Sequence, residues 1–390
     1  MSFRERGRLA GRLLLTMGLL SAGTAYPSKA GEYQVTPTFD AQGEYNSNVF
    51  MSATDRRSAI ITTLSPGLEL SKRNEILDAA LSNRFSWLRY SDEVHRDTVD
   101  HAHQGAVRHS LSPRLSVSGS ALFARESRTD RDLQATGIIN TSLGPRNRQA
   151  YSLGGAYAIS ELTRASLSGS FNRDDYSNPL LVGSETHGGT LGVDHDLRGV
   201  LENIRGRAGL TYTEYLFPGS RQENASATVG VTRELAEKWG VSADFGGRLT
   251  KAETETRGWV GQVGGSYRGE RNSANLSFSR DLSTASGAAG LTLRNAVTLT
   301  VARAITEEIA GSCYAAYFRN RTDSTGSGTV PFLERTLEVR PSLSWRVFKD
   351  VSVQGSWSYV RIKSGQPAQL VTADRNVFLL LLAARHEMFE

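Results

Sequence analysis

The feature that most constrains this chain is the alternation of apolar and polar residues along many short segments. In "YQVTPTFDAQGEY" (33–45), Phe39 and Tyr45 would share one face of a strand, while Asp40 and Glu44 would share the other. The same period-2 pattern recurs in "LSVSGSALF" (115–123), "ASLSGSF" (165–171), "LTLRNAVTLTV" (291–301) and "VSVQGSWSY" (351–359). Most of these segments are close to the ten residues that a tilted strand needs to cross hydrocarbon.

The connections between these segments form two sets. Short ones include "SKRNE" (71–75), "LSPR" (111–114), "LAEKW" (235–239) and "VFKD" (347–350). Longer polar ones include "RTDRDLQATGIINTSLGPRNR" (128–148), "NRDDYSNPLLVGSE" (172–185) and "KSGQPAQLVTAD" (363–374). Short turns on one rim and longer loops on the other are typical of bacterial outer-membrane barrels. A soluble sandwich with Greek-key connections has no reason to keep this alternation.

The pattern therefore predicts an all-β fold, a single-chain transmembrane antiparallel β-barrel that occupies residues 31–390. One strand per about 20 residues gives about 18 strands, within a range of 16–18. A closed sheet satisfies all backbone hydrogen bonds inside hydrocarbon, where open edges are forbidden. Aromatic residues such as Tyr33, Trp239 and Trp357 gather near the strand ends, as two interfacial girdles would require. The sequence has no Trp-Asp blade signature of a β-propeller.

Composition agrees with a barrel. The chain has 38 glycines, 10 prolines and a hydrophobic fraction of 39%, with no apolar run long enough for a transmembrane helix. A barrel hides its apolar surface in alternate positions, so its average hydropathy resembles that of a soluble protein. Cys313 is the single cysteine, which excludes an internal disulfide. The net charge of +5 is spread over scattered arginines, so no nucleic-acid partner is predicted.

The N-terminus predicts export. The basic stretch "MSFRERGRLAGR" is followed by the apolar "LLLTMGLLSAGTA" (13–25) and by small residues at 23 and 25 or at 28 and 30. This order is that of a secretory signal peptide, so residues 1–30 are predicted to be removed by cleavage after residue 25 or 30. The predicted location is the bacterial outer membrane, with lipid and lipopolysaccharide as the surroundings of the barrel.

No residue is predicted to be catalytic, to bind a cofactor or to hold a metal. His101, His103 and His109 share a face of one expected strand and are interpreted as scattered polar lining. Hydroxyl and amide groups of a wet interior can bind sugar hydroxyls, and arginine can pair with carboxylates or phosphates. The polar face of the strands gives the following candidate lumen-lining residues: Asp40, Glu44, Asp78, Arg84, Arg207, Asp244, Arg248, Arg294, Glu334, Glu338, Arg340 and Arg346.

Two motifs carry a family resemblance. In "GEYNSNVF" (43–50), the acidic-Tyr-x-x-Asn-apolar-aromatic pattern is formed by Glu44, Tyr45, Asn48, Val49 and Phe50. In "ITTLSPGLELS" (61–71), a Thr-x-Ser-Pro-Gly-x-x-Leu pattern is formed by Thr63, Ser65, Pro66, Gly67 and Leu70. With these motifs the chain resembles the outer-membrane β-barrel porins found with exosortase and exopolysaccharide loci. The resemblance implies a large barrel that works in the secretion of long polysaccharides.

The functional hypothesis is thus a channel that serves as a conduit for an extracellular polysaccharide, not an enzyme. A general porin for small solutes is the first alternative, and an outer-membrane lipid-modifying enzyme is the second. A loop folded into the lumen would favour the small-solute porin, and the 128–148 connection is the candidate for such a loop. Expected partners are a polysaccharide in the lumen and a periplasmic polysaccharide-export protein at the short-turn rim; no cofactor is expected.

Overall fold

The computed structural model describes residues 32–91, 97–139, 144–199, 203–284, 287–323, 332–366 and 369–388. The predicted signal peptide, residues 1–30, lies outside them. The described residues form strands β1 (Glu32–Asn46), β2 (Ala59–Arg73), β3 (Leu77–Tyr90), β4 (Thr98–Ser110), β5 (Leu115–Glu126), β6 (Arg146–Ala158), β7 (Thr163–Tyr176), β8 (Ser184–Asp196), β9 (Ile204–Phe217), β10 (Ser220–Ala236), β11 (Trp239–Lys251), β12 (Glu255–Arg268), β13 (Asn272–Thr284), β14 (Leu291–Ala304), β15 (Ile309–Thr322), β16 (Leu333–Phe348), β17 (Val351–Gln366) and β18 (Gln369–Arg385), and the helix α2 (Leu133–Thr136).

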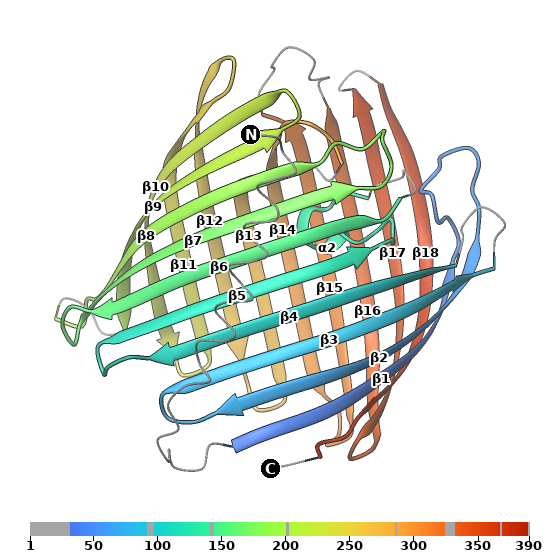
Figure 1. Cartoon of the computed structure of the whole chain (residues 1–390), viewed down its shortest axis with the longest axis horizontal. Coiled ribbons are helices and arrows are strands. Elements are labelled where there is room, and N and C mark those ends of the chain that lie inside the picture. The colour runs from blue at the N-terminus through green and yellow to red at the C-terminus, as the bar shows by residue number, and fades with distance from the viewer. Residues whose placement is uncertain are drawn as a thin grey trace, which may run out of the picture.

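The strands form one closed 18-stranded sheet in which each strand pairs with its neighbours in the sequence (Figure 1). The ring closes where β1 pairs antiparallel with β18, for example Tyr45 with Phe378, while its other side pairs with β2. This confirms the predicted all-β barrel and the strand number. Closure leaves no strand with a free edge, which is the condition for placing a sheet in hydrocarbon.

The two faces of the wall differ as the alternation predicts. On β1, Phe39 and Tyr45 are each 44% exposed, whereas Asp40 and Glu44 are 9% and 2% exposed. The outer face carries large exposed apolar side chains on every part of the ring, among them Leu153, Val229 and Leu380. Apolar residues thus point outward and polar ones inward, the reverse of a soluble barrel. No helix in the described residues has the length and apolar character needed to cross a bilayer.

The two rims also differ, with exceptions to the expected pattern. Connections 74–76, 111–114, 237–238 and 349–350 are short and share one rim with the first residues of β1 and the last of β18. The opposite, long-loop rim holds connections 47–58, 127–145 and 177–183. Tight turns at 218–219, where Gly219 has φ 77, and at 252–254 also lie on this rim, so the alternation of loop lengths is not strict.

One expected loop is mostly strand. The segment 363–374 was predicted to be a polar loop, but β17 continues to Gln366 and β18 begins at Gln369. Its polar side chains break the apolar pattern because the two strands extend past the apolar belt, where both faces of a sheet can be polar. The ladder continues there, since Lys363 pairs with Thr372 and Gly365 with Leu370.

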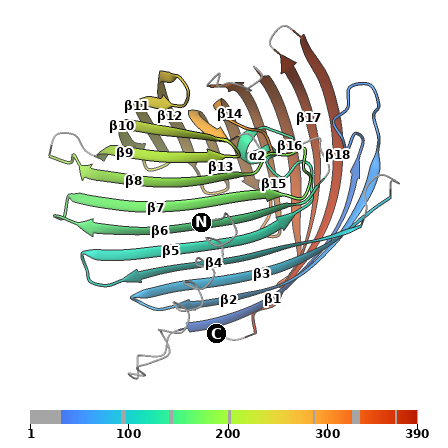
Figure 2. The same ribbon diagram turned by 45° about the horizontal axis from the view of Figure 1, so that its top comes forward.

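The main apolar cluster lies inside the barrel at the long-loop rim. Met51, Leu133, Ile139, Val360, Ile362 and Ala373 are all buried against one another. These residues come from the 47–58 loop, the 127–145 loop and strands β17 and β18. Apolar side chains can cluster inside the barrel here because α2 lies within the ring of strands rather than above it, as Figure 2 shows.

Candidate channel and its inward-folded loop

The connection between β5 and β6 is described at residues 127–139 and 144–145, and we call these residues the inward-folded loop. It carries α2, which ends at Gly137 with φ 75, and the Gly137 N–H donates to the Leu133 carbonyl at 2.8 Å. A Cβ at Gly137 would lie 2.3 Å from Cγ of Phe318, an inward side chain of β15. Positive φ and this close approach together require glycine at the position.

The tip of the inward-folded loop is bonded to the far wall. Asn320 on β15 donates to the Thr136 carbonyl at 2.9 Å, and Thr336 on β16 donates to the Gly137 carbonyl at 2.6 Å. Arg294 on β14 donates to the Ala135 carbonyl. Going round the ring from β5 through β4, β3, β2, β1, β18, β17 and β16, β15 is the eighth strand reached, nearly half of the ring. The loop therefore crosses the lumen (Figure 2).

The start of the loop is held at the place where the barrel closes. Arg128 pairs with Glu44 on β1 at 2.8 Å, and Asp130 pairs with Arg375 on β18 at 2.9 Å. The Glu44 and Arg375 side chains are only 1% and 3% exposed. Because both wall partners are removed from water, the loss of either loop partner would leave a buried charge uncompensated.

These contacts shift the pKa values of the two loop residues. Burial alone would raise the pKa of Asp130, but the charges of Arg128 and Arg375 and their hydrogen bonds outweigh it and hold that pKa well below its ordinary value. Burial would likewise lower the pKa of Arg128, but Asp130 and Glu44 raise it well above the ordinary value. The loop is thus attached to the wall by permanently charged groups.

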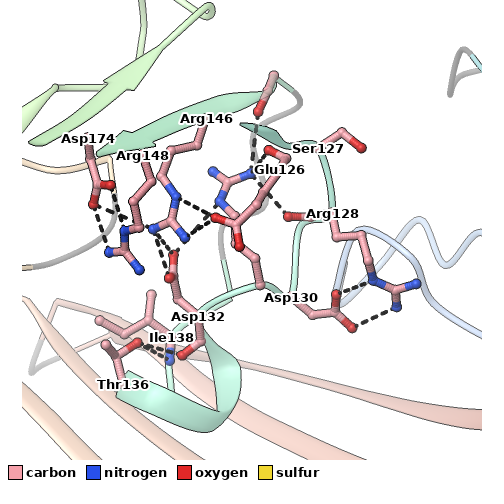
Figure 3. Close-up of polar contacts among 12 residues, drawn as sticks. Glu126, Ser127, Arg128, Asp130, Asp132, Thr136, Ile138, Arg146, Arg148 and Asp174 are labelled. Carbon is pink, nitrogen blue, oxygen red and sulfur yellow. Dashed lines mark hydrogen bonds and ion pairs between the residues drawn. The ribbon is translucent and has the colours of Figure 1, made fainter. Parts of the chain in front are cut away.

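The base of the loop is fixed by a second charge network (Figure 3). Arg146, which is 1% exposed, pairs with Glu126 at 2.5 Å and with Asp132 at 2.9 Å. Asp174 on β7 accepts from Arg148 at 2.9 Å and lies 3.5 Å from Arg146. Since Glu126 and Arg146 flank the loop and Asp132 lies within it, the network ties its two ends together.

A cavity of ≈ 720 Å³ lies in the lumen beside the loop. Its lining includes the polar side chains of Asp40, Gln42, Arg84, Arg128, Gln354 and Arg385. The volume falls within the range of about 300–1,000 Å³ that is usual for small-molecule pockets. The space left beside the loop is therefore suited to hydrated solutes.

The twelve candidate lumen residues all occupy inward positions of their strands. Some are paired with each other or with nearby inward charges: Asp40 with Arg84, Arg207 with Asp244, Arg294 with Asp281, and Arg248 with Asp323. Glu334 is buried, and Glu338 lies 4.0 Å from Arg340. When the Gln134 side-chain amide is oriented with its oxygen toward Arg340, that oxygen accepts a hydrogen bond from the Arg340 guanidinium at 3.0 Å. Most of the wall charge is thus neutralised within the wall.

The twelve residues do not form one site. Glu44, Arg294 and Arg340 contact the inward-folded loop. Asp78 and Arg346 lie instead at the short-turn rim, where Asp78 is 3.6 Å from Arg73 and Arg346 donates to the Glu307 carbonyl at 2.7 Å. A contact of any of them with a solute stays a prediction.

Pairs of hydroxyl groups line the inner wall between the charged positions. Five cross-strand pairs face the lumen at 2.6 to 3.2 Å: Ser65–Ser86, Ser120–Ser152, Thr190–Thr211, Ser277–Thr298 and Ser312–Ser342. They occur on strands all around the ring. Neutral hydroxyl pairs offer donors and acceptors without a net charge.

Sequence reasoning missed the residues that hold the loop: Arg128, Asp130, Asp132, Arg146, Asp174 and Arg375. The visible signal is the charge density of "RTDRD" (128–132) next to the two arginines of "RNR" (146–148). The interpretation of the histidines was wrong, because His101 and His103 share the outer face with Val99 and Val107, which are 46% and 44% exposed. Among the described residues, no group of three or more His, Cys, Asp or Glu is placed to hold a metal.

These observations define the class of the protein. A closed antiparallel 18-stranded barrel with an apolar outer face, a polar interior and one loop across the lumen is a β-barrel of the outer-membrane porin type. A family model described as "Putative beta-barrel porin 2" matches residues 23–188, which include both sequence motifs.

Solved structures are similar to this chain at low sequence identity. The Pseudomonas aeruginosa porin OccK2 (OpdF) is 10% identical, with a TM-score of 0.50 over 92% of this chain and 98% of that chain. The same protein in complex with glucuronate gives the same values. The P. aeruginosa siderophore receptor PirA is 12% identical, with a TM-score of 0.45 over 93% of this chain and 81% of that one. A search of curated proteins finds no match.

Proposed function

We propose that the protein is an outer-membrane channel for carbohydrate-like solutes and that the inward-folded loop sets its constriction. The observation that carries the proposal is the course of this loop, which is bonded to β1 and β18 at one end and to β14–β16 at its tip. A segment held on both sides of a lumen limits what passes.

The chemistry of the inner wall supports a neutral, hydroxyl-bearing solute. Fixed charges such as Arg207 on β9 and Asp244 on β11 are paired with each other across β10, so they present little net field to a passing ion. The hydroxyl pairs of the wall can exchange hydrogen bonds with sugar hydroxyls at small cost, since donors and acceptors are replaced in kind.

We further propose that the solute is an extracellular polysaccharide on its way out. The resemblance at residues 43–71 supports this role, and a periplasmic export protein would then dock at the short-turn rim. A polymer needs the loop to leave its place in the lumen, so the conduit would be gated. Asn48, a residue of the motif at 43–50, is 0% exposed and donates to the carbonyl of Asp374 at 3.0 Å. Asp374 lies on β18, the strand that holds the start of the loop through Arg375.

The second candidate is a porin for small solutes. The position of the inward-folded loop and the ≈ 720 Å³ cavity beside it favour this function, because a fixed constriction suits molecules of a few sugar units or fewer. The two candidates differ in whether the loop must move during transport.

Single-channel conductance in planar bilayers tests the constriction. Gly137→Leu would place a side chain into Phe318 at positive φ, so it should displace α2 and raise the conductance several-fold. The matched control is Gly155→Leu, since Gly155 faces outward with no atom near its Cβ position. A heat-modifiable gel shift establishes that each variant is a folded barrel. Equal conductance of folded wild-type and Gly137→Leu protein would rule out the loop as the constriction.

A further inference from the structure

A row of basic side chains on four strands follows the outer face of the sector β13–β17 at the long-loop rim. We call it the basic row, and it consists of Arg280 on β13, Arg319 and Arg321 on β15, Arg335 on β16, and Arg361 and Lys363 on β17. On each strand these basic residues lie an even number of positions from exposed outer residues, so they point to the outer face. Tyr317, two positions before Arg319, is 42% exposed, and Leu337, two positions after Arg335, is 40% exposed.

The sheet register places these cations side by side. Arg280 is opposite Asn295, Asn295 is opposite Arg319, Arg319 is opposite Arg335, and Arg335 is opposite Lys363. Directly opposed like charges on one face of a sheet are destabilising unless something else neutralises them. The row is therefore an unfavourable arrangement for the isolated barrel.

The basic row has little counter-charge within the described residues, because Asp323, the acid that acts on Arg280, is itself paired with Arg248. Arg319, Arg321, Arg335, Arg361 and Lys363 are exposed, and none of them forms an ion pair there. The outward positions of β13 to β17 contain no aspartate or glutamate. Asp374, opposite Arg361 on β18, is already paired with Arg56 at 2.7 Å.

The other side of the same rim is built differently. Three outward cations there are neutralised locally: Arg173 by Asp175 at 2.8 Å, Arg221 by Glu214 at 2.7 Å, and Arg257 by Glu255 at 2.9 Å. These pairs lie on β7, β9, β10 and β12. Outward acids thus accompany the cations on these four strands, whereas β13–β17 carry none.

The height of the basic row on the barrel identifies the layer that it meets. The guanidinium of Arg280 lies 4.3 Å from the ring centre of Trp259, and Tyr317 and Trp357 lie just below Arg319 and Arg361 on the outer face. Exposed Trp and Tyr mark the boundary between hydrocarbon and headgroups. The row is therefore at headgroup level on the long-loop rim, which faces the cell exterior in barrels of this type.

We propose that the basic row binds the phosphates of a lipopolysaccharide molecule in the outer leaflet. Arginine donates bidentate hydrogen bonds to phosphate, and a row of cations on four strands suits a headgroup that carries more than one phosphate. The apolar face of β13–β17 directly below, with Val297, Tyr317 and Leu343 exposed, would contact the acyl chains. Binding removes the repulsion within the row and covers this sector of the barrel with lipid.

Native mass spectrometry of the purified barrel with added lipid A tests the proposal. Arg319→Gln/Arg335→Gln/Lys363→Gln should weaken binding on the order of a hundredfold, because each basic residue near an anionic headgroup contributes roughly a factor of five. The matched control, Arg173→Gln/Arg221→Gln/Arg257→Gln, removes the same charge from the paired side and should keep wild-type affinity. Dephosphorylated lipid A should bind the wild-type protein as weakly as phosphorylated lipid A binds the row variant.

Three results from the binding comparison would overturn the proposal, and a fourth comes from competition with inorganic phosphate. The first three are equal affinity of wild-type and row variant, equal loss in the control variant, and equal binding of lipid A with and without phosphate. Displacement of lipid A by inorganic phosphate at a similar concentration would show a site for the free ion instead and would also contradict a lipid site. A heat-modifiable gel shift confirms that each variant used is folded.

Discussion

At the residue scale, the alternation of single side chains decides which solvent each one meets. Val117 and Ser118 are neighbours on β5, yet Val117 shares the outer face with Phe123, which is 39% exposed, and Ser118 shares the inner face with Ser120. A charged side chain that is tolerated on the inner face should therefore prevent assembly on the outer face. Val117 and Ser118 test this at two adjacent positions of one strand.

We predict that Val117→Arg prevents assembly of the barrel, whereas Ser118→Arg does not. An arginine that faces lipid in a barrel costs up to roughly 2–4 kcal/mol, most at the bilayer midplane and less toward the interfaces, and it costs little when it faces a wet lumen. The yield of heat-modifiable protein in outer-membrane fractions measures the difference. The same comparison between Val353→Arg and Gln354→Arg on β17 is an independent repeat, and equal yields in both pairs would contradict the face assignment.

At the element scale, the inward-folded loop shows what the sequence can and cannot predict. Strands, faces and strand number follow from period-2 alternation, because each residue's environment depends on its immediate neighbours. The loop was recognised as a candidate for the lumen from its length, but its anchors were not. Arg375 is 245 positions from Asp130 in the sequence, so no local pattern links them.

The same limit explains the outward histidines and the segment 363–374. His103 shows the period of its strand but not its face, and it is accommodated on the outer wall by a 2.9 Å contact with Asn83. The polar composition of 363–374 indicates contact with water, which both a loop and a strand beyond the apolar belt can provide. The sequence shows that these residues are polar. Their position along the membrane normal depends on how all the strands of the barrel are arranged, which no local pattern shows.

We predict that the loop stays in place in mild acid because of Asp130. Its pKa is depressed in the folded protein, so its stabilising contribution is fully present above the ordinary carboxylate pKa of about 4 and is lost only as pH falls through the depressed value. Wild-type conductance should thus be constant between pH 8 and pH 5.

Asp130→Asn removes this charge and should raise the conductance across that whole pH range. Loss of one partner of a buried ion pair costs about 3–5 kcal/mol, here by leaving Arg375 without its counter-charge. Asp175→Asn is the control, since Asp175 forms its ion pair with Arg173 on the outer face. A wild-type conductance step between pH 5 and pH 7 would show that another group controls the loop.

At the scale of the whole molecule, the barrel joins three surfaces with different tasks. The outer face is apolar, the basic row is the sector that we propose for phosphorylated headgroups, and the inner wall with its paired charges and hydroxyls is the surface that we propose for sugars. The loop is anchored at the seam between β1 and β18, where the motif at residues 43–50 also lies. Movement of the loop would therefore change the contacts of residues 43–50, and a change at residues 43–50 would alter the position of the loop.

A deletion strain can distinguish a polysaccharide from small sugars as the transported solute. We predict that a strain without this protein continues to synthesise an extracellular polysaccharide but no longer displays it, because an 18-stranded lumen exceeds what side chains alone can fill and the wall chemistry suits a hydrated polymer. Surface and intracellular polymer are measured separately, and uptake of small sugars is measured in parallel. Complementation with wild type should restore display, whereas Gly155→Leu serves as a neutral variant that should restore it equally. Normal surface polymer together with reduced sugar uptake in the deletion strain would establish the small-solute function and exclude the polymer.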